Sequence, residues 1–131
     1  MPESLSDQPI ILGARGIIRK RMEMSEIVVT RDKQGSFIEA KKNDIIVFHL
    51  DENLTTGYIW EIEKAVYQPV VELVDSSYTE FPGKLLGRGG TRIMRFVAKF
   101  EGDQEIRLTL RRSWEPFDKA IEHLQVTVKV R

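Results

Sequence analysis

The sequence contains no cysteine and only two histidines, and its 20 basic residues are balanced by 20 acidic ones. Without cysteine the chain can form no disulfide, thiol nucleophile or thiolate metal site, so its stability has to come from packing. A formal net charge of zero provides no overall attraction to nucleic acid or to anionic lipid. No apolar run approaches the roughly 20 residues that a membrane helix requires. We therefore expect a soluble protein that contacts neither nucleic acid nor membrane.

The residue patterns of enzyme active sites are also missing from the sequence. His49 and His123 are far apart in the chain, and neither has a metal-ligand spacing such as His-Glu-x-x-His. There is no nucleophile elbow, phosphate-binding loop or dinucleotide fingerprint. Asp51 and Glu52 are adjacent, so on a strand their carboxylates point to opposite faces and cannot act as an acid–base pair. We expect no catalytic residue, no metal and no cofactor, and therefore not an enzyme.

Length and regional composition indicate one domain preceded by a short extension. A chain of 131 residues corresponds to a single domain with one core. The first 24 residues show neither strand-like alternation nor helical spacing, so we expect residues 1–24 to form an N-terminal extension and residues 25–131 the folded domain. The apolar residues 9–13 are too few for a secretory signal, which needs about 7 to 15. With no signal peptide, the protein is expected in the cytoplasm if the sequence is complete.

From residue 27 onward, apolar and polar residues alternate with a period of two, which is typical of β-strands. The predicted strands cover residues 26–30, 37–41, 45–50, 58–63, 66–74, 93–100, 106–111 and 124–130. Pro69 predicts that its strand is broken or lies at a sheet edge. The alternation is clearest in the last three strands, whose expected core residues are Met94, Phe96, Ala98, Phe100, Ile106, Leu108, Leu110, Leu124, Val126, Val128 and Val130.

The first two of these three strands are unsuited to a simple hairpin. If their apolar faces both pointed inward, Lys99 would lie opposite Arg107, and Arg95 opposite Arg111. Like charges directly across a strand pair are destabilising. We therefore place the two strands in different sheets, as in an all-β, immunoglobulin-like β-sandwich with Greek-key connections. Trp60 suits the buried tryptophan of such folds.

Three connections between predicted strands contain more glycine, threonine, arginine and tryptophan than a simple turn requires. They read Asn-Leu-Thr-Thr-Gly-Tyr over residues 53–58, Leu-Gly-Arg-Gly-Gly-Thr over 86–91 and Arg-Arg-Ser-Trp-Glu-Pro over 111–116. In an immunoglobulin-like sandwich the corresponding loops leave the same end, so we expect them to be neighbours. Gly57 is expected to adopt a positive φ, and the glycines at 87, 89 and 90 allow a close approach to another surface. Trp114 lies outside the core alternation and is either a lid over the end of the sandwich or an exposed anchor.

The order Thr-Thr-Gly-Tyr-x-Trp, Gly-x-Gly-Gly and Arg-x-Trp resembles the chagasin family of cysteine peptidase inhibitors. The resemblance extends from about residue 27 to the C-terminus, with the three motifs in family order. It implies an immunoglobulin-like sandwich that reversibly inhibits papain-like cysteine peptidases; we expect this protein to be a monomer. The peptidase-binding residues that the resemblance implies are Asn53, Leu54, Thr55, Thr56, Gly57, Gly87, Arg88, Gly89, Gly90, Arg112, Ser113 and Trp114.

The resemblance also implies how these residues act. Residues 55–57 enter the catalytic cleft of the peptidase, Arg112 and Trp114 brace one side of the cleft, and residues 87–90 lie along the other side. The strand that begins at Tyr58 is expected to support the first loop from the core rather than to contact the peptidase.

Two departures from the family motifs keep other interpretations open. Leu54 and Ser113 stand where the family usually has proline, so either loop is expected to be more mobile. An alternative is therefore an immunoglobulin-like binding or assembly module without inhibitory activity. A third interpretation, which the neutral net charge disfavours, is a basic face for an acidic ligand or nucleic acid made by Arg88, Arg92, Arg95, Arg107, Arg111 and Arg112.

Overall fold

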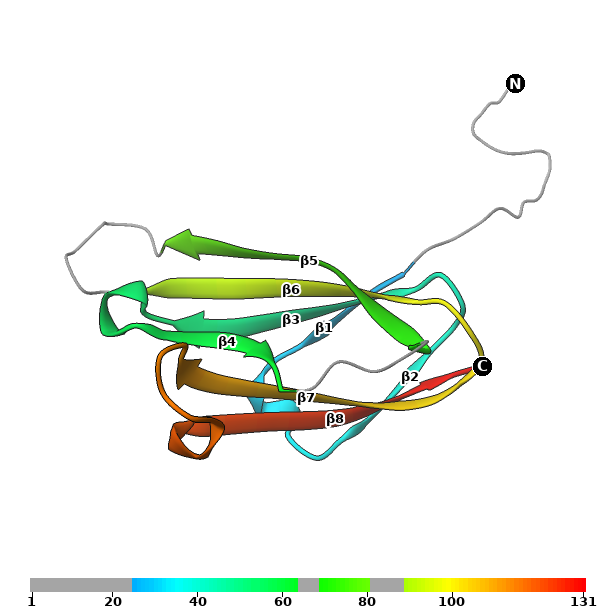
Figure 1. The fold of residues 1–131 in the computed structure, drawn as a ribbon. Coiled ribbons are helices and arrows are strands. Elements are labelled where there is room, and N and C mark those ends of the chain that lie inside the picture. Colours follow the sequence, from blue (N-terminus) through cyan, green and yellow to red (C-terminus); the bar gives the residue numbers. More distant parts are fainter. Residues whose placement is uncertain (1–24, 64–68, 81–88) are drawn as a thin grey trace, which may run out of the picture.

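Two four-stranded sheets face each other across one apolar core in the computed structural model, which describes residues 25–63, 69–80 and 89–131 (Figure 1). The first sheet has the order β1-β3-β6-β5 and consists of β1 (Glu26–Val29), β3 (Ile45–Glu52), β5 (Val71–Glu80) and β6 (Gly90–Ala98). The second has the order β2-β8-β7-β4 and consists of β2 (Phe37–Ala40), β4 (Tyr58–Ile62), β7 (Gly102–Arg112) and β8 (Glu122–Val130). Short 3₁₀ turns η2 (Arg31–Lys33), η3 (Leu54–Thr56) and η4 (Phe117–Lys119) lie in the connections. The predicted immunoglobulin-like β-sandwich is confirmed.

Strands β1 and β2 do not pair with each other across the turn that follows residue 30. Strand β1 pairs in parallel with β3, and β2 pairs in parallel with β8, so the short connection crosses from one sheet to the other. The remaining pairs in both sheets are antiparallel. The two N-terminal strands therefore extend the outer edges of the two sheets instead of forming a hairpin.

The core follows the period-two pattern of the strands. Phe48 of β3 and Phe96 of β6 meet edge to face, with ring centroids 5.4 Å apart. Of the core residues predicted in the last three strands, all are buried except Phe100, which is 56% exposed. The prediction was wrong there because β6 ends at Ala98. The backbone N–H groups of Lys99 and Phe100 both donate to the carbonyl of Val70, which turns the chain out of the strand.

The two strands that were predicted to avoid a hairpin are in different sheets, as expected. Arg95 of β6 lies between Val47 and Asp75 of its neighbouring strands, and Arg111 of β7 lies opposite Ile59. Neither arginine therefore lies opposite a basic residue in these pairs, because the residues opposite are apolar or acidic.

Strand β5 lies at a sheet edge, as one of the two predictions had it, but its first and last residues differ from those predicted. It is an edge strand, as Pro69 indicated, and its pairing is irregular between Leu73 and Asp75. It begins at Val71 and runs to Glu80, whereas residues 66–68 of the predicted strand lie outside the described residues. The half of β5 that was not predicted, residues 75–80, is polar and largely exposed at the sheet edge, so its sequence shows no apolar alternation. Residues 1–24, the predicted extension, also lie outside the description, and no helix among the described residues has the length and hydropathy of a membrane span.

Candidate functional site

Strands β3 and β4, β5 and β6, and β7 and β8 have their connected ends at the same end of the sandwich, on the left of Figure 1. We call residues 53–57 between β3 and β4 loop 1, residues 81–89 between β5 and β6 loop 2, and residues 113–121 between β7 and β8 loop 3. The strand pairs bring their stems together, since Glu52 is opposite Gly90 and Tyr58 is opposite Arg112. Gly89 is the described residue of loop 2, and the predicted site residues Gly87 and Arg88 lie outside the described residues.

Loop 1 is a single 3₁₀ turn held by its own polar groups. The side-chain oxygen of Asn53 accepts hydrogen bonds from the backbone N–H and the hydroxyl of Thr55, at 3.0 and 2.6 Å. The Asn53 carbonyl accepts from the Thr56 hydroxyl at 2.7 Å, and the Leu54 carbonyl accepts from the Gly57 N–H at 3.1 Å. Gly57 closes the turn with φ 82°, which confirms its expected left-handed conformation. The loop is therefore shaped before any partner arrives.

Loop 3 and the end of β7 pack against loop 1, through an aromatic ring and a guanidinium group respectively. The ring of Trp114 covers Gly57, and a Cβ built there would lie 3.3 Å from both Cζ2 and Cζ3 of the indole. Arg112 donates from Nε to the Thr56 carbonyl at 2.9 Å, and its guanidinium lies 4.3 Å from the centroid of the Tyr58 ring. Trp114 remains 69% exposed with one edge resting on the glycine, so it is not a lid buried over the end of the sandwich.

Gly89 brings the end of loop 2 against loop 1, and Gly90 packs closely against the end of β5. A Cβ on Gly89, which has φ 90°, would lie 3.1 Å from the Glu52 carbonyl oxygen and 3.3 Å from Cβ of Asn53. A Cβ on Gly90 would lie 2.1 Å from the Thr79 carbonyl oxygen, which leaves no room for a side chain. The glycines therefore allow the close approach that the sequence predicted. For the described residues, the expected gathering of the three motifs at one end is confirmed.

A buried carboxylate joins the stems of loops 1 and 2. Glu52, whose side chain is fully buried, accepts from the backbone N–H of Trp60 at 2.6 Å and from Arg92 Nη2 at 2.7 Å. The guanidinium of Arg92 continues to Tyr78 of β5, 5.8 Å from the ring centroid. Sequence reasoning treated Glu52 only as half of an unsuitable acid pair. The signal for its position was that it continues the core-facing alternation of Phe48 and Leu50.

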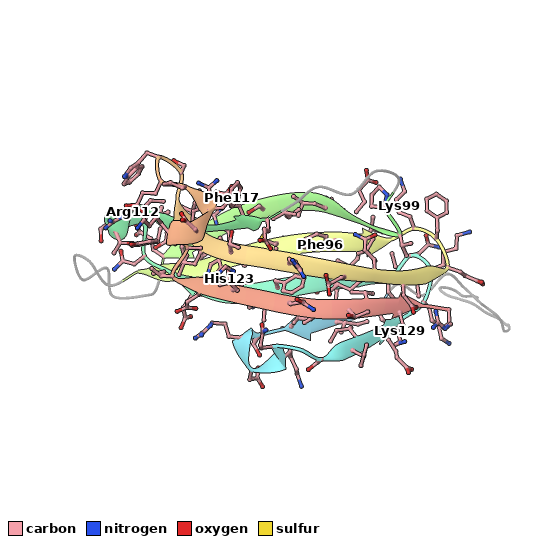
Figure 2. The ribbon with its side chains drawn as sticks, turned by 60° about the horizontal axis from the view of Figure 1, so that its bottom comes forward. Phe96, Lys99, Arg112, Phe117, His123 and Lys129 are labelled. Carbon is pink, nitrogen blue, oxygen red and sulfur yellow. The ribbon has the colours of Figure 1, made fainter. Side chains whose placement is uncertain are left out.

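The chemistry of this end is that of a contact surface rather than a reaction centre. Figure 2 shows Arg112 and Phe117 at this end, with Lys99 at the other. The described part of loops 1 and 3 presents threonine hydroxyls, glycine backbone and large apolar side chains, of which Leu54, Trp114, Phe117 and Ile121 are 47 to 69% exposed. Among the described residues, no three His, Cys, Asp or Glu side chains are grouped to hold a metal ion.

The arginines proposed as a basic face are neutralised in place. Arg88 lies outside the described residues, and each of the others is paired with a carboxylate: Arg92 with Glu52, Arg95 with Asp75, Arg107 with Glu105 and Glu63, Arg111 with Glu61, and Arg112 with Glu115. These pairs are also divided between the two sheets. Such an arrangement does not form the single-signed surface that phosphate binding requires.

Comparisons with known proteins point to one family. The model of a family described as "Chagasin family peptidase inhibitor I42" matches residues 39–129. Chagasin from Trypanosoma cruzi is 29% identical over 89 residues, which cover 66% of this chain and 81% of chagasin. A cysteine protease inhibitor from Entamoeba histolytica has a similar structure, with a TM-score of 0.73 and 23% identity, covering 85% of this chain and all of that one. The solution structure of amebosin matches with a TM-score of 0.65 and 24% identity, covering 81% of this chain and 98% of amebosin.

Proposed function

The chain belongs to the chagasin family of peptidase inhibitors, and from this premise we propose that loops 1, 2 and 3 together block the active-site cleft of papain-like cysteine peptidases. The chain is thus an inhibitor and not an enzyme. The observation that supports this proposal most strongly is that the small residues of loop 1 and the exposed indole of loop 3 are in direct contact at Gly57 and Trp114. They form one projection, which we call the wedge, made of residues 53–57 and 112–114.

In this mechanism, residues 55–57 enter the cleft, and Arg112 and Trp114 brace one of its walls. Glycine and threonine are small enough to approach the catalytic groups closely, and the indole supplies apolar contact area beside them. Tryptophan and arginine are the residue types most enriched among strongly contributing interface positions. Gly89 lies beside Asn53 of the wedge, and in this mechanism loop 2 contacts the opposite wall of the cleft.

The wedge resists cleavage because three carbonyl oxygens of loop 1 are hydrogen-bonded within the inhibitor, so that they are not free to occupy the oxyanion hole of a peptidase. The carbonyls of Asn53, Leu54 and Thr56 accept hydrogen bonds from Thr56, Gly57 and Arg112 of the inhibitor itself. A 3₁₀ turn also keeps the backbone away from the extended form in which a peptide lies along a cleft. Nucleophilic attack needs a carbonyl carbon held about 3 to 3.5 Å from the thiolate in the right orientation. The turn fills the cleft without offering that geometry.

The hydrogen bonds within loop 1 also favour tight binding. A loop that is ordered before docking loses less conformational entropy on binding, so more of the contact energy appears as affinity. The usual contact between a protease and its protein inhibitor buries about 1,600 Å² in total, and in this proposal the three loops supply the inhibitor's share.

A titration of papain with the purified protein, followed with a fluorogenic peptide substrate, tests this function. We expect inhibition that is reversed on dilution, because no covalent step is involved. Thr56→Arg should raise the inhibition constant at least tenfold, since a long side chain at the tip of loop 1 prevents entry into the cleft. Glu101→Arg, an exposed position in the β6–β7 turn at the opposite end, is the control and should leave inhibition unchanged. Papain activity that is unaffected at high micromolar protein would instead favour a binding module without inhibitory activity.

A further inference from the structure

Arg111 lies inside the stem of loop 3 and contacts the backbone of that loop at several points. Its side chain is only 11% exposed. From Nη1 it donates to the carbonyl of Glu115 at 2.7 Å, and the carbonyls of Arg112 and Ser113 lie 3.2 and 3.5 Å from the same nitrogen. The ring of Phe117 covers the guanidinium, 3.9 Å from its central carbon to the ring centroid. One side chain thus gathers both ends of the segment that carries the exposed indole.

The opposite edge of the same guanidinium is fixed to the sheet. Arg111 Nη2 lies 3.4 Å from a carboxylate oxygen of Glu61, which belongs to the neighbouring strand β4. The Nε atom of Arg111 is buried with no hydrogen-bond partner. The guanidinium is therefore oriented so that it reaches the loop carbonyls and Glu61, and this orientation leaves its buried Nε without a partner.

The backbone of the segment that Arg111 holds is not restrained by a proline of its own. Residues 112–115 contain no proline, so no φ angle is locked before Pro116. We propose that Arg111 is a positioning residue for inhibition: it restrains residues 112–115 from the side, and thereby supplies the preorganisation that a proline at position 113 would give from within. This inference rests on the proposed inhibitory function, because it concerns how Trp114 is presented to the peptidase.

The planar fork of arginine is needed for this role. A guanidinium donates in several fixed directions at once and stacks on aromatic rings, whereas a lysine ammonium is a point charge on a flexible stem. Arg107 provides a matched comparison, because it lies four residues earlier on the same strand. It is 54% exposed and is paired with the carboxylates of Glu105 and Glu63.

The test compares Arg111→Lys with Arg107→Lys. We expect Arg111→Lys to raise the papain inhibition constant about tenfold, mainly through faster dissociation, and Arg107→Lys to change it less than twofold. Adding Ser113→Pro to Arg111→Lys should recover most of the loss. The preceding residue, Arg112, ends strand β7 and so has the extended backbone that a following proline requires. Because a loop proline can also stabilise the fold through its unfolded state, urea denaturation of each variant is measured alongside, and recovery of inhibition without a matching gain in stability supports the positioning role.

A second measurement tests how well the wedge is ordered in the absence of peptidase. The ¹⁵N order parameter of the Trp114 indole should be high in the wild type and in Arg107→Lys, and should fall below about 0.6 in Arg111→Lys. If the wild type does not inhibit papain, the proposed function fails, while this order parameter still decides the role of Arg111. If Arg111→Lys matches Arg107→Lys in both the inhibition constant and the indole order parameter, the role of Arg111 is overturned.

Discussion

The indole ring of Trp114 lies so close to the backbone of Gly57 that a Cβ atom at the glycine would be 2.4 Å from Cη2 of the ring. A glycine with φ 82° is thus required twice, once for the turn and once for the contact. The shape of loop 1 and the position of the exposed tryptophan are consequently coupled. A substitution at either residue is therefore expected to displace the other.

Gly57→Ala should weaken inhibition at least tenfold, because the new methyl group displaces the indole. It should also destabilise the fold by roughly 1–2 kcal/mol through its left-handed backbone. Gly35→Ala is the matched control, since Gly35 has φ 80° and nothing within 4 Å of its built Cβ. The control should lose similar stability and retain full inhibition. Equal inhibition constants for the two variants would show that the Gly57–Trp114 contact has no part in binding.

Trp114→Ala should reduce the affinity for papain by about 2 kcal/mol or more, roughly 30-fold, because an exposed aromatic anchor is lost. The melting temperature should change little, since the side chain is 69% exposed. Phe100→Ala removes another exposed ring, at the opposite end, and should leave the inhibition constant within twofold of wild type. A Trp114→Ala variant as potent as Phe100→Ala would rule out the anchor.

Glu52→Gln should lower the free energy of unfolding by about 3 kcal/mol, because it leaves the largely buried guanidinium of Arg92 without its carboxylate. Urea denaturation at neutral pH measures this change. Asp75→Asn breaks the exposed pair with Arg95 in the same sheet and should cost about 1 kcal/mol or less. Similar losses in the two variants would mean that burial of the Glu52–Arg92 pair adds nothing.

Acid stability should depend in part on Asp103, at the end opposite the loops. The hydrogen bond from Arg131, followed by the charge of Lys129, holds the pKa of this carboxyl below its ordinary value of 3.8. A carboxyl with a lowered folded-state pKa stabilises the fold above the unfolded-state pKa, and this contribution is lost as the pH falls through the folded-state pKa. The stability difference between wild type and Asp103→Asn should therefore shrink from about pH 5 to about pH 2. A difference that is constant over this range would contradict the assignment.

Much of the scaffold follows from the residues alone. The alternation at Ile106, Leu108 and Leu110 predicted a buried strand face, and the like charges at Arg95 and Arg111 correctly separated two consecutive strands into different sheets. The buried position of Trp60 was also predicted. These predictions succeeded because burial of one face and repulsion of like charges depend on residue type and spacing.

Other features were decided only when distant segments met. A period of two shows which side chains share a face but not which strand lies beside them, so it could not show that β1 and β2 pair in parallel with β3 and β8. It also extended the core to Phe100, because the bend that ends β6 is made by hydrogen bonds to Val70, a residue about 30 positions away.

The sequence by itself determined the two-sheet scaffold, the glycine turn of loop 1 and the three motifs that mark the family. The tertiary structure alone decided how the segments that carry those motifs are held together, through Arg112 on the Thr56 carbonyl and Glu52 between Trp60 and Arg92. Alternation and turn chemistry are local properties of the chain. The contacts that hold the wedge and the stems of its loops join residues 8 to 56 positions apart, and such pairings exist only once the strands have paired and the two sheets have packed.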